Sequence, residues 1–495
     1  MTPVRQRKTN GRRRGAVAVI DIGSNSLRLV VYDALNRAPR MLFNEKVLCG
    51  LGRDIDETGK LHPEGVRLAT ENLRRFVSLA RAVPVSRLHV LATAAVRDAA
   101  DGGAFVRKLE RNLRIRANIL SGAEEGRLSA FGVIAGIPGA AGVMGDLGGA
   151  SVEMAPLAGG QVGPSASLPI GPLRLLDIAD DERRLRDVID RHLDSLRWLD
   201  DRTFDEFYAV GGAWRALARI HMQQSGYPLH VIQQYTLSRS ASEEYLEVVA
   251  QLSRKSLEKI TAISRKRLDT VPFAARVLHR LLRRTQPERL IFSAYGLREG
   301  HLYNLLDEIE QQQDPLLAGA ATMAQSHRRF GGAGDELFTW TQPLYPRETA
   351  EHRRLRHAAA RLSEIAWAEH PDYRAEQALR MTLFMPLPGI SHGERAFLAT
   401  ILHARYGGSD PGETVRRLLD DESLTVARSI GLALRLGTTL TGGVPRSLTG
   451  ARLGLENGAL QLTLGRESAK RMGETVYRRL DALGRAIGKK AEVRL

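Results

Sequence analysis

The stretch VAVIDIGSNSLRLVVYD, residues 17–33, decides the fold of this chain. An apolar run typical of a β-strand ends at Asp21, and the small polar turn Gly23–Ser26 follows it. Apolar residues alternate from Leu27 to Tyr32, which predicts a second strand. Backbone N–H groups and hydroxyls in such a turn can hold a phosphate, although Asp and Asn are also common in ordinary turns. The stretch therefore predicts a hairpin with a carboxylate at the end of a buried strand.

The same layout recurs at VMGDLGGASVEM, residues 143–154. A strand again ends at an aspartate, Asp146, and a turn of small residues and a second strand follow it. Two such hairpins facing each other would make a two-sided phosphate clamp. Asp21 and Asp146 would then be available to Mg²⁺, which prefers one or two carboxylates together with waters and phosphate oxygens. An accidental repeat of this kind is much less probable than either hairpin alone.

Strand and helix patterns alternate around the two hairpins, which predicts an α/β domain whose sheet is covered by helices. Before the second hairpin we expect strands at 88–92 and 115–120 and helices at 63–80, 101–113 and 121–134. After it the alternation continues, with a helix at 180–198 and strands at 207–210 and 289–293.

Two further residues, Glu125 and Arg97, are candidates for catalysis and for phosphate binding. Ser121 and Glu124 fit a capping box, in which each side chain binds the other residue's backbone N–H. Glu125 points about 100° further round the helix and could act as a general base on water beside a bound phosphate, although a solvated acidic first turn is the simpler explanation. Arg97 follows a strand end, where α/β sheets bind ligands, and could grip a phosphate, although an arginine-rich chain has many surface arginines.

Composition limits the class of protein. A length of 495 residues suggests about two to four domains. The single cysteine, Cys49, excludes an intramolecular disulfide and a cysteine metal cluster, and it favours a reducing, cytoplasmic location. No apolar run has the length of a membrane-spanning helix, and the N-terminus lacks the apolar part of a secretory signal. The net charge of +16 predicts a polyanionic partner, whereas 5% aromatic residues give little support to stacking on nucleic acid bases.

The two ends of the chain differ from its middle. Residues 1–15 are basic and almost free of apolar side chains, which predicts a disordered tail. A polar break at 308–315 predicts a domain boundary, and the pattern beyond it is helical to about residue 440. The last part of the chain predicts a hairpin at Asn457-Gly458, a helix over 466–487 and a strand at 491–495.

Taken together, five segments resemble the exopolyphosphatase / guanosine pentaphosphate phosphatase family of the actin, sugar-kinase and heat-shock-chaperone superfamily: Val17–Asp33, Leu91–Asp98, Ile119–Arg127, Gly145–Glu153 and Tyr208–Arg215. The resemblance implies an α/β fold with two ribonuclease-H-like (actin-like ATPase) domains and an active site in the cleft between them. An α-helical HD-like domain and a small α/β C-terminal cap would follow. The expected domains span residues 16–135, 136–308, 315–445 and 446–495.

By position, the resemblance implies a role for each candidate residue. Glu125 matches the catalytic base, and Asp21, Asp146 and Glu153 match the carboxylates that hold the metal and orient water. The substrate phosphates would be bound by Arg97 and by the two turns, which contribute Ser24, Asn25, Ser26, Gly148, Gly149, Ala150 and Ser151. On general grounds the Gly-Gly turn that ends at Gly212, at a helix start, is another anion site, although it could be a plain strand-to-helix turn. Ala150 departs from the family pattern, which commonly has a third glycine there. The expected metal is Mg²⁺, with Mn²⁺ as the alternative.

The HD-like domain is expected to lack a working metal site. Its histidines His357, His370 and His392 are spread along the chain, and His392 is followed by Gly393-Glu394 rather than by an aspartate. We therefore expect these histidines to be structural or exposed.

The favoured function is processive hydrolysis of the terminal phosphate of inorganic polyphosphate by a Mg²⁺-assisted water that Glu125 activates. The alternatives are a phosphatase of guanosine 5′-triphosphate 3′-diphosphate (pppGpp), a kinase or ATPase on the same fold, and a non-catalytic polyanion-binding protein. The matched acidic hairpins argue against the last, because carboxylates repel a polyanion unless a metal intervenes. We expect a homodimer with no specific nucleic acid partner and no membrane span.

Overall fold

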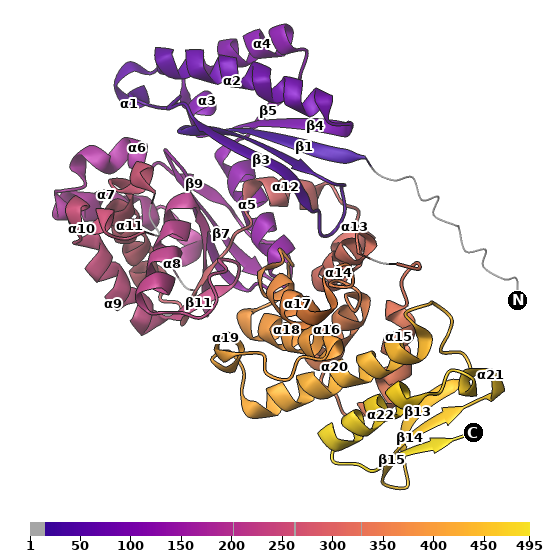
Figure 1. Ribbon diagram of the computed structural model, residues 1–495. Coiled ribbons are helices and arrows are strands. Elements are labelled where there is room, and N and C mark those ends of the chain that lie inside the picture. The colour runs from indigo at the N-terminus through magenta and orange to yellow at the C-terminus, as the bar shows by residue number, and fades with distance from the viewer. Residues whose placement is uncertain (1–14, 201, 262–263, 328) are drawn as a thin grey trace, which may run out of the picture.

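The computed structural model describes residues 15–200, 202–261, 264–327 and 329–495. Two α/β units with one large sheet each are followed by a helical region that carries a small sheet at its end (Figure 1). Apart from Gly15, the basic segment predicted at 1–15 lies outside the described residues. In the part of the chain that the structure describes, no helix combines the length and apolar character needed to cross a membrane.

The first sheet has five strands in the order β3-β2-β1-β4-β5. Strand β1 is antiparallel to β2 and parallel to β4. Residues alternate between its two faces, so Ala18 and Ile20 pack under the covering helices while Val17 and Val19 enter a core shared with the second sheet. The strands are β1 (Ala16–Ile22), β2 (Ser26–Tyr32), β3 (Met41–Leu48), β4 (Val85–Ala92) and β5 (Ala117–Ile119), and the covering helices are α2 (Pro63–Ala82) and α4 (Gly102–Leu113).

The second sheet has seven strands, with β11-β12-β10-β6-β7-β8 in order and β9 paired to β7. Helices α7, α8, α9 and α11 pack on one face, and α5 and α12 lie between the two sheets (Figure 1). The strands are β6 (Gly142–Leu147), β7 (Val152–Ala158), β8 (Gln161–Val162), β9 (Ala166–Leu168), β10 (Glu206–Gly211), β11 (Tyr235–Ser238) and β12 (Arg289–Phe292). The helices are α5 (Gly122–Gly136), α7 (Glu182–Asp194), α8 (Gly212–Gln224), α9 (Arg239–Ala250), α11 (Thr270–Thr285) and α12 (Leu297–Asn304).

The predicted repetition of the hairpin is confirmed. In each sheet an antiparallel hairpin, β1–β2 or β6–β7, lies beside a parallel strand. Each turn is closed by the same backbone hydrogen bond, from Gly23 to Ser26 at 3.0 Å and from Gly148 to Ser151 at 2.9 Å. The register places a cation opposite the first aspartate and a carboxylate opposite the second, since the pairs are Asp21 with Arg28 and Asp146 with Glu153.

The C-terminal region is helical and ends in a three-stranded sheet. One hydrophobic core runs through both parts, from Leu316 in the helices to Leu460 in the sheet. The main elements are α14 (Pro315–Gln325), α15 (Gly334–Thr341), α16 (Ala350–Arg361), α17 (Arg374–Phe384), α18 (His392–Tyr406), α20 (Asp421–Thr441), β13 (Ala451–Glu456), β14 (Ala459–Leu464), α22 (Glu474–Ala486) and β15 (Ala491–Arg494).

Of the predictions made for the C-terminal part of the chain, one is confirmed and one is wrong. The Asn457-Gly458 turn is confirmed, with both residues at positive φ, 49° and 78°, as a tight hairpin turn requires. The single helix predicted over 466–487 is wrong, because it is interrupted between α21 (Arg466–Ala469) and α22. Gly473 lies in the gap with extended backbone, and glycine costs about 1 kcal/mol in a helix relative to alanine.

Candidate active site

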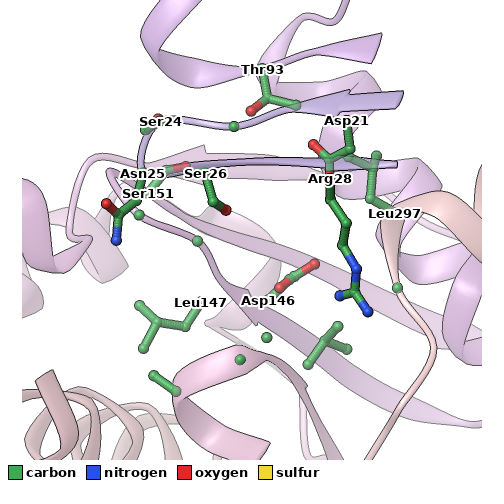
Figure 2. A pocket seen from close by; sticks show the side chains of 18 of the residues that line it. Asp21, Ser24, Asn25, Ser26, Arg28, Thr93, Asp146, Leu147, Ser151 and Leu297 are labelled. Atoms are coloured by element: carbon green, nitrogen blue, oxygen red, sulfur yellow. The ribbon is translucent and has the colours of Figure 1, made fainter. Parts of the chain in front are cut away.

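A cavity of about 390 Å³ lies between the two sheets. Both hairpin turns line it, together with the start of α5, the start of α8 and the start of α12. In Figure 2, Asn25 and Ser151 lie at one end of this cavity, Asp21 and Arg28 lie at the other, and Asp146 enters from the opposite sheet. The two repeated bends therefore share one cavity.

The turns touch each other. A Cβ placed on Gly149 would lie 3.2 Å from the Asn25 Cβ and 3.3 Å from the Asn25 nitrogen, so a larger residue at this position would push the turns apart. Two hydrogen bonds to neighbouring segments hold the first turn in place. The Ser24 hydroxyl accepts one from the Ala95 N–H at 3.1 Å, and the Asn25 carbonyl accepts one from the Cys49 N–H at 3.0 Å.

These contacts leave backbone donors for a ligand. Within the described ranges, the N–H groups of Ser24, Asn25 and Gly149 donate to no protein acceptor, and all three residues line the cavity. Several N–H groups gathered in one concavity form an anion site without the need for a lysine. The turns are therefore suited to a phosphoryl group.

Four carboxylates line the same cavity, and each has a protein partner. Arg298 donates to Asp21 at 2.7 Å, Ser129 donates to Asp146 at 2.7 Å, and Ser151 and Ser167 donate to one oxygen of Glu153 at 2.6 and 2.8 Å. Arg97 donates to Glu125 at 2.9 Å. Glu125 is placed by the predicted capping box, which is confirmed: Ser121 and Glu124 satisfy each other's backbone N–H and leave Glu125 to face inward.

Burial dominates the electrostatics of this group. It raises the pKa of Glu125 to about 7, against the opposing effect of Arg97 and with a smaller contribution from Asp21 and Asp146. Burial also raises the pKa of Asp146, and it raises the pKa of Glu153 well above its usual range, where Glu125 and Asp146 add to the effect. A carboxylate with a pKa near neutrality suits a general base.

The donor set fits a hard divalent cation. Asp21 and Asp146 present carboxylate oxygens from the two facing hairpins, and burial raises the pKa of Asp146, with a smaller contribution from Asp21. Among the residues that the structure describes, no three His, Cys, Asp or Glu side chains are grouped so that they could hold a metal ion. A two-carboxylate set completed by water and phosphate oxygens is the arrangement that Mg²⁺ prefers.

Five cations line the cavity beside these carboxylates: Arg28, Lys46, Arg215, Arg267 and Arg298. Burial lowers the pKa of Arg215 to about 10, and Arg298 and Arg28 add to this effect. Figure 2 shows the Arg28 side chain extending from the first sheet into the cavity. The sequence reasoning missed all five as site residues. The only signal was register, because Arg28 holds the same place in its hairpin as Glu153 in the other.

The structure brings together all of the predicted site residues except two. Arg97, on α3 (Ala94–Asp98), lies behind Glu125 rather than on the cavity wall. Ala150 is buried, and its carbonyl accepts a hydrogen bond from the Gly171 N–H at 3.1 Å. Gly212 lines the cavity where a Cβ would come within 2.5 Å of the Arg267 guanidinium.

The histidines of the helical region lie apart from one another. His357 contacts Asp335 at 2.8 Å, and His370 is exposed beside Asp372. His392 is buried, and its Nδ1 lies 2.9 Å from the Tyr227 hydroxyl at the contact with the second sheet's domain.

Two family models match the chain. The model of the Ppx/GppA phosphatase family matches residues 16–309, and the model described as "Exopolyphosphatase, C-terminal" matches residues 317–494. The first match covers more than half of the chain and contains every residue that lines the cavity.

Solved structures share the fold of the first part. A Ppx/GppA family member from Aquifex aeolicus is 21% identical, with a TM-score of 0.52 over 61% of this chain and 99% of its own. An exopolyphosphatase from Cytophaga hutchinsonii is 24% identical, with a TM-score of 0.54 over 59% of this chain and 97% of its own. The predicted fold class is confirmed: two actin-like α/β domains precede a helical region with a small sheet.

Proposed function

Because the chain belongs to the Ppx/GppA phosphatase family, we propose that this hydrolase is an exopolyphosphatase that removes terminal phosphates from inorganic polyphosphate one after another. One observation carries the proposal: a carboxylate with a pKa of about 7 shares a cavity with two N–H-rich turns and five cations. The match of the C-terminal region to the model described as "Exopolyphosphatase, C-terminal" supports the same substrate.

Each part of the cavity has its own role in the hydrolysis of the terminal phosphate. The free N–H groups of the two turns hold the terminal phosphoryl group, and Glu125 takes a proton from the attacking water. A bond forms between the water oxygen and phosphorus while the bond to the bridging oxygen breaks, so that inorganic phosphate and a chain one unit shorter leave. Glu153, held by two serine hydroxyls, orients the water. Positioning and electrostatics are the main requirements of phosphoryl transfer.

Asp21 and Asp146 would hold Mg²⁺, with Mn²⁺ as the alternative. Bound there, the ion would supply positive charge beside the phosphate oxygens. Arg298 already neutralises one oxygen of Asp21, so the site has its own positive charge on that side.

Beyond the terminal phosphate, the cations of the cavity wall hold the next phosphates of the chain. Lys46 tests this assignment because its charge depends on pH. Burial lowers its pKa to about 8, and the cations Arg267, Arg28 and Arg215 add to the effect. The residue as a whole is exposed, so water screens part of this shift and the measured pKa should lie between about 8 and the ordinary value.

Lys46→Gln is expected to raise KM for polyphosphate about five-fold at pH 7, the equivalent of about 1 kcal/mol for an exposed charge contact. The wild-type KM should rise as pH increases through the pKa of Lys46, because the ammonium is then lost. This rise should be absent from Lys46→Gln and from Lys46→Arg, which stays charged. Steady-state kinetics between pH 7 and pH 10 measure it, with Lys108→Gln as the surface control. An unchanged KM in Lys46→Gln would remove Lys46 from the substrate path.

Phosphate release tests the proposed function directly. With Mg²⁺ present, kcat/KM on long-chain polyphosphate is expected to exceed that on pppGpp at least about ten-fold, or about 1.4 kcal/mol in transition-state binding. The affinity for polyphosphate should fall steeply as salt is added, by analogy with other polyanions. Faster turnover of pppGpp would reassign the substrate within the same family, and tight ATP binding without phosphate release from either compound would favour the kinase alternative.

A further inference from the structure

Arg174 joins the two α/β domains at one side of the cavity. It lies on α6 (Pro172–Leu175), in the second domain, and its two terminal nitrogens reach two acids of the first domain. Nη2 donates to Asp98 at 2.6 Å, and Nη1 lies 3.1 Å from Asp56. The guanidinium therefore holds two separate elements, α3 and α1 (Ile55–Thr58), with one planar fork.

The ion pair continues to Glu125. One oxygen of Asp98 accepts from Arg174, and the other lies 3.1 Å from Nε of Arg97. Arg97 in turn donates from Nη1 to Glu125 at 2.9 Å. Acids and bases thus alternate along a line from the carboxylate in the cavity to the domain junction, and each group orients the next.

Two elements that carry this line, α6 and α3, are hydrogen-bonded to the phosphate turns. On the second domain, the Leu173 N–H donates to the Gly149 carbonyl at 2.9 Å, one residue from Arg174. On the first domain, the Ala95 N–H at the start of α3 donates to the Ser24 hydroxyl at 3.1 Å. A displacement of Arg174 relative to Asp98 would therefore change the spacing of the two turns.

The Asp98 arm should be the stronger of the two. The side chains of Arg174 and Asp98 are 18% and 33% exposed, whereas that of Asp56 is 52% exposed, and ion pairs weaken as water reaches them. The buried Nε of Arg174 has no acceptor in the described part of the chain, so the two terminal nitrogens make all of its polar contacts to the protein. A lysine could reach one acid but could not span both with a rigid fork.

We propose that Arg174 is a positioning residue that locks the two domains at the spacing the phosphate turns need and aligns Arg97 against Glu125. The consequence for catalysis rests on the proposed function, whereas the domain lock does not. The two are therefore tested by separate measurements.

The first measurement needs no substrate. Cys49, the single cysteine, is buried, so spin labels can be placed at Ser78→Cys on α2 and Arg183→Cys on α7, both exposed positions. In Arg174→Gln the distance distribution between the labels, recorded by double electron–electron resonance, is expected to broaden and shift to longer distances. Arg284→Gln, which removes a single ion pair to Asp200 inside the second domain, should leave it unchanged. A wild-type distribution in Arg174→Gln would overturn the lock.

The second measurement is kinetic. Arg174→Gln is expected to lower kcat/KM about 10- to 100-fold, as misplacement of catalytic groups by about 1 Å does, and Arg174→Lys should recover part of the loss. The dependence of kcat/KM on pH should also change in Arg174→Gln. Because Arg97 is then less firmly held, the pKa of Glu125 rises and the acid limb of the profile moves to higher pH. An acid limb that stays in place would overturn the alignment of Arg97. If the labels respond but the wild type releases no phosphate from polyphosphate, the lock stands and the proposed function fails.

Discussion

Glu125→Gln is expected to lower kcat for phosphate release from polyphosphate by about 10²- to 10⁴-fold, because the amide cannot accept the proton of the attacking water. The same group should set the acid limb of the wild-type profile. Its raised pKa means that Glu125 is protonated and inactive below about pH 7 and ionised above it, so activity should rise through that pH. Phosphate release measured between pH 5 and pH 9 checks both expectations.

Polyphosphate binding should largely survive this change, because the turns and cations that hold the substrate are untouched. Glu124→Gln supplies a matched control: it is the same substitution one residue earlier on the helix, at an exposed position whose only described contacts are those of the capping box. Full activity in Glu125→Gln, or an equal loss in both variants, would show that the assigned base is wrong.

The sequence predicted those parts of the site that are encoded locally. The two hairpins and the capping box each occupy a short continuous segment, so period, turn residues and spacing are enough to find them. Repetition then implied that Asp21 and Asp146 face each other, and the structure places both on one cavity. The direction in which the Arg97 side chain points was harder to predict. Helix α3 begins at Ala94, one turn before Arg97, and this places the Arg97 guanidinium behind Glu125 instead of in the cavity.

The five cations that line the cavity could not be predicted, because they come from elements that are separate in the sequence. Arg28 and Lys46 lie on neighbouring strands, Arg215 and Arg298 lie at the starts of two helices, and Arg267 lies in a segment with no motif. The chain has 72 Lys and Arg residues, so composition gives no reason to choose these five. Arg174 was missed for the same reason, since its partners are distant in the chain and only tertiary packing brings them to it.

Asp146→Asn is expected to lower phosphate release by about 10²- to 10³-fold at a fixed low Mg²⁺ concentration, the equivalent of about 3–4 kcal/mol of transition-state stabilisation. The substitution removes one of the two carboxylates that face each other across the cavity, and an amide oxygen is a weaker ligand for a hard cation. Titration of activity with Mg²⁺, and Mn²⁺ binding followed by electron paramagnetic resonance, measure the loss of metal affinity separately from the loss of turnover.

Unfolding would not explain this loss. The pKa of Asp146 is raised by burial, so its charge costs folding free energy at neutral pH, and an asparagine removes that cost while its oxygen can still accept the hydrogen bond from Ser129. Thermal unfolding of Asp146→Asn at pH 7 should therefore occur at or above the wild-type temperature. Asp187→Asn, at an exposed position on α7, controls for the substitution itself. If Asp146→Asn kept the wild-type dependence on Mg²⁺, the metal would have to be held elsewhere, and the facing hairpins would serve the phosphate alone.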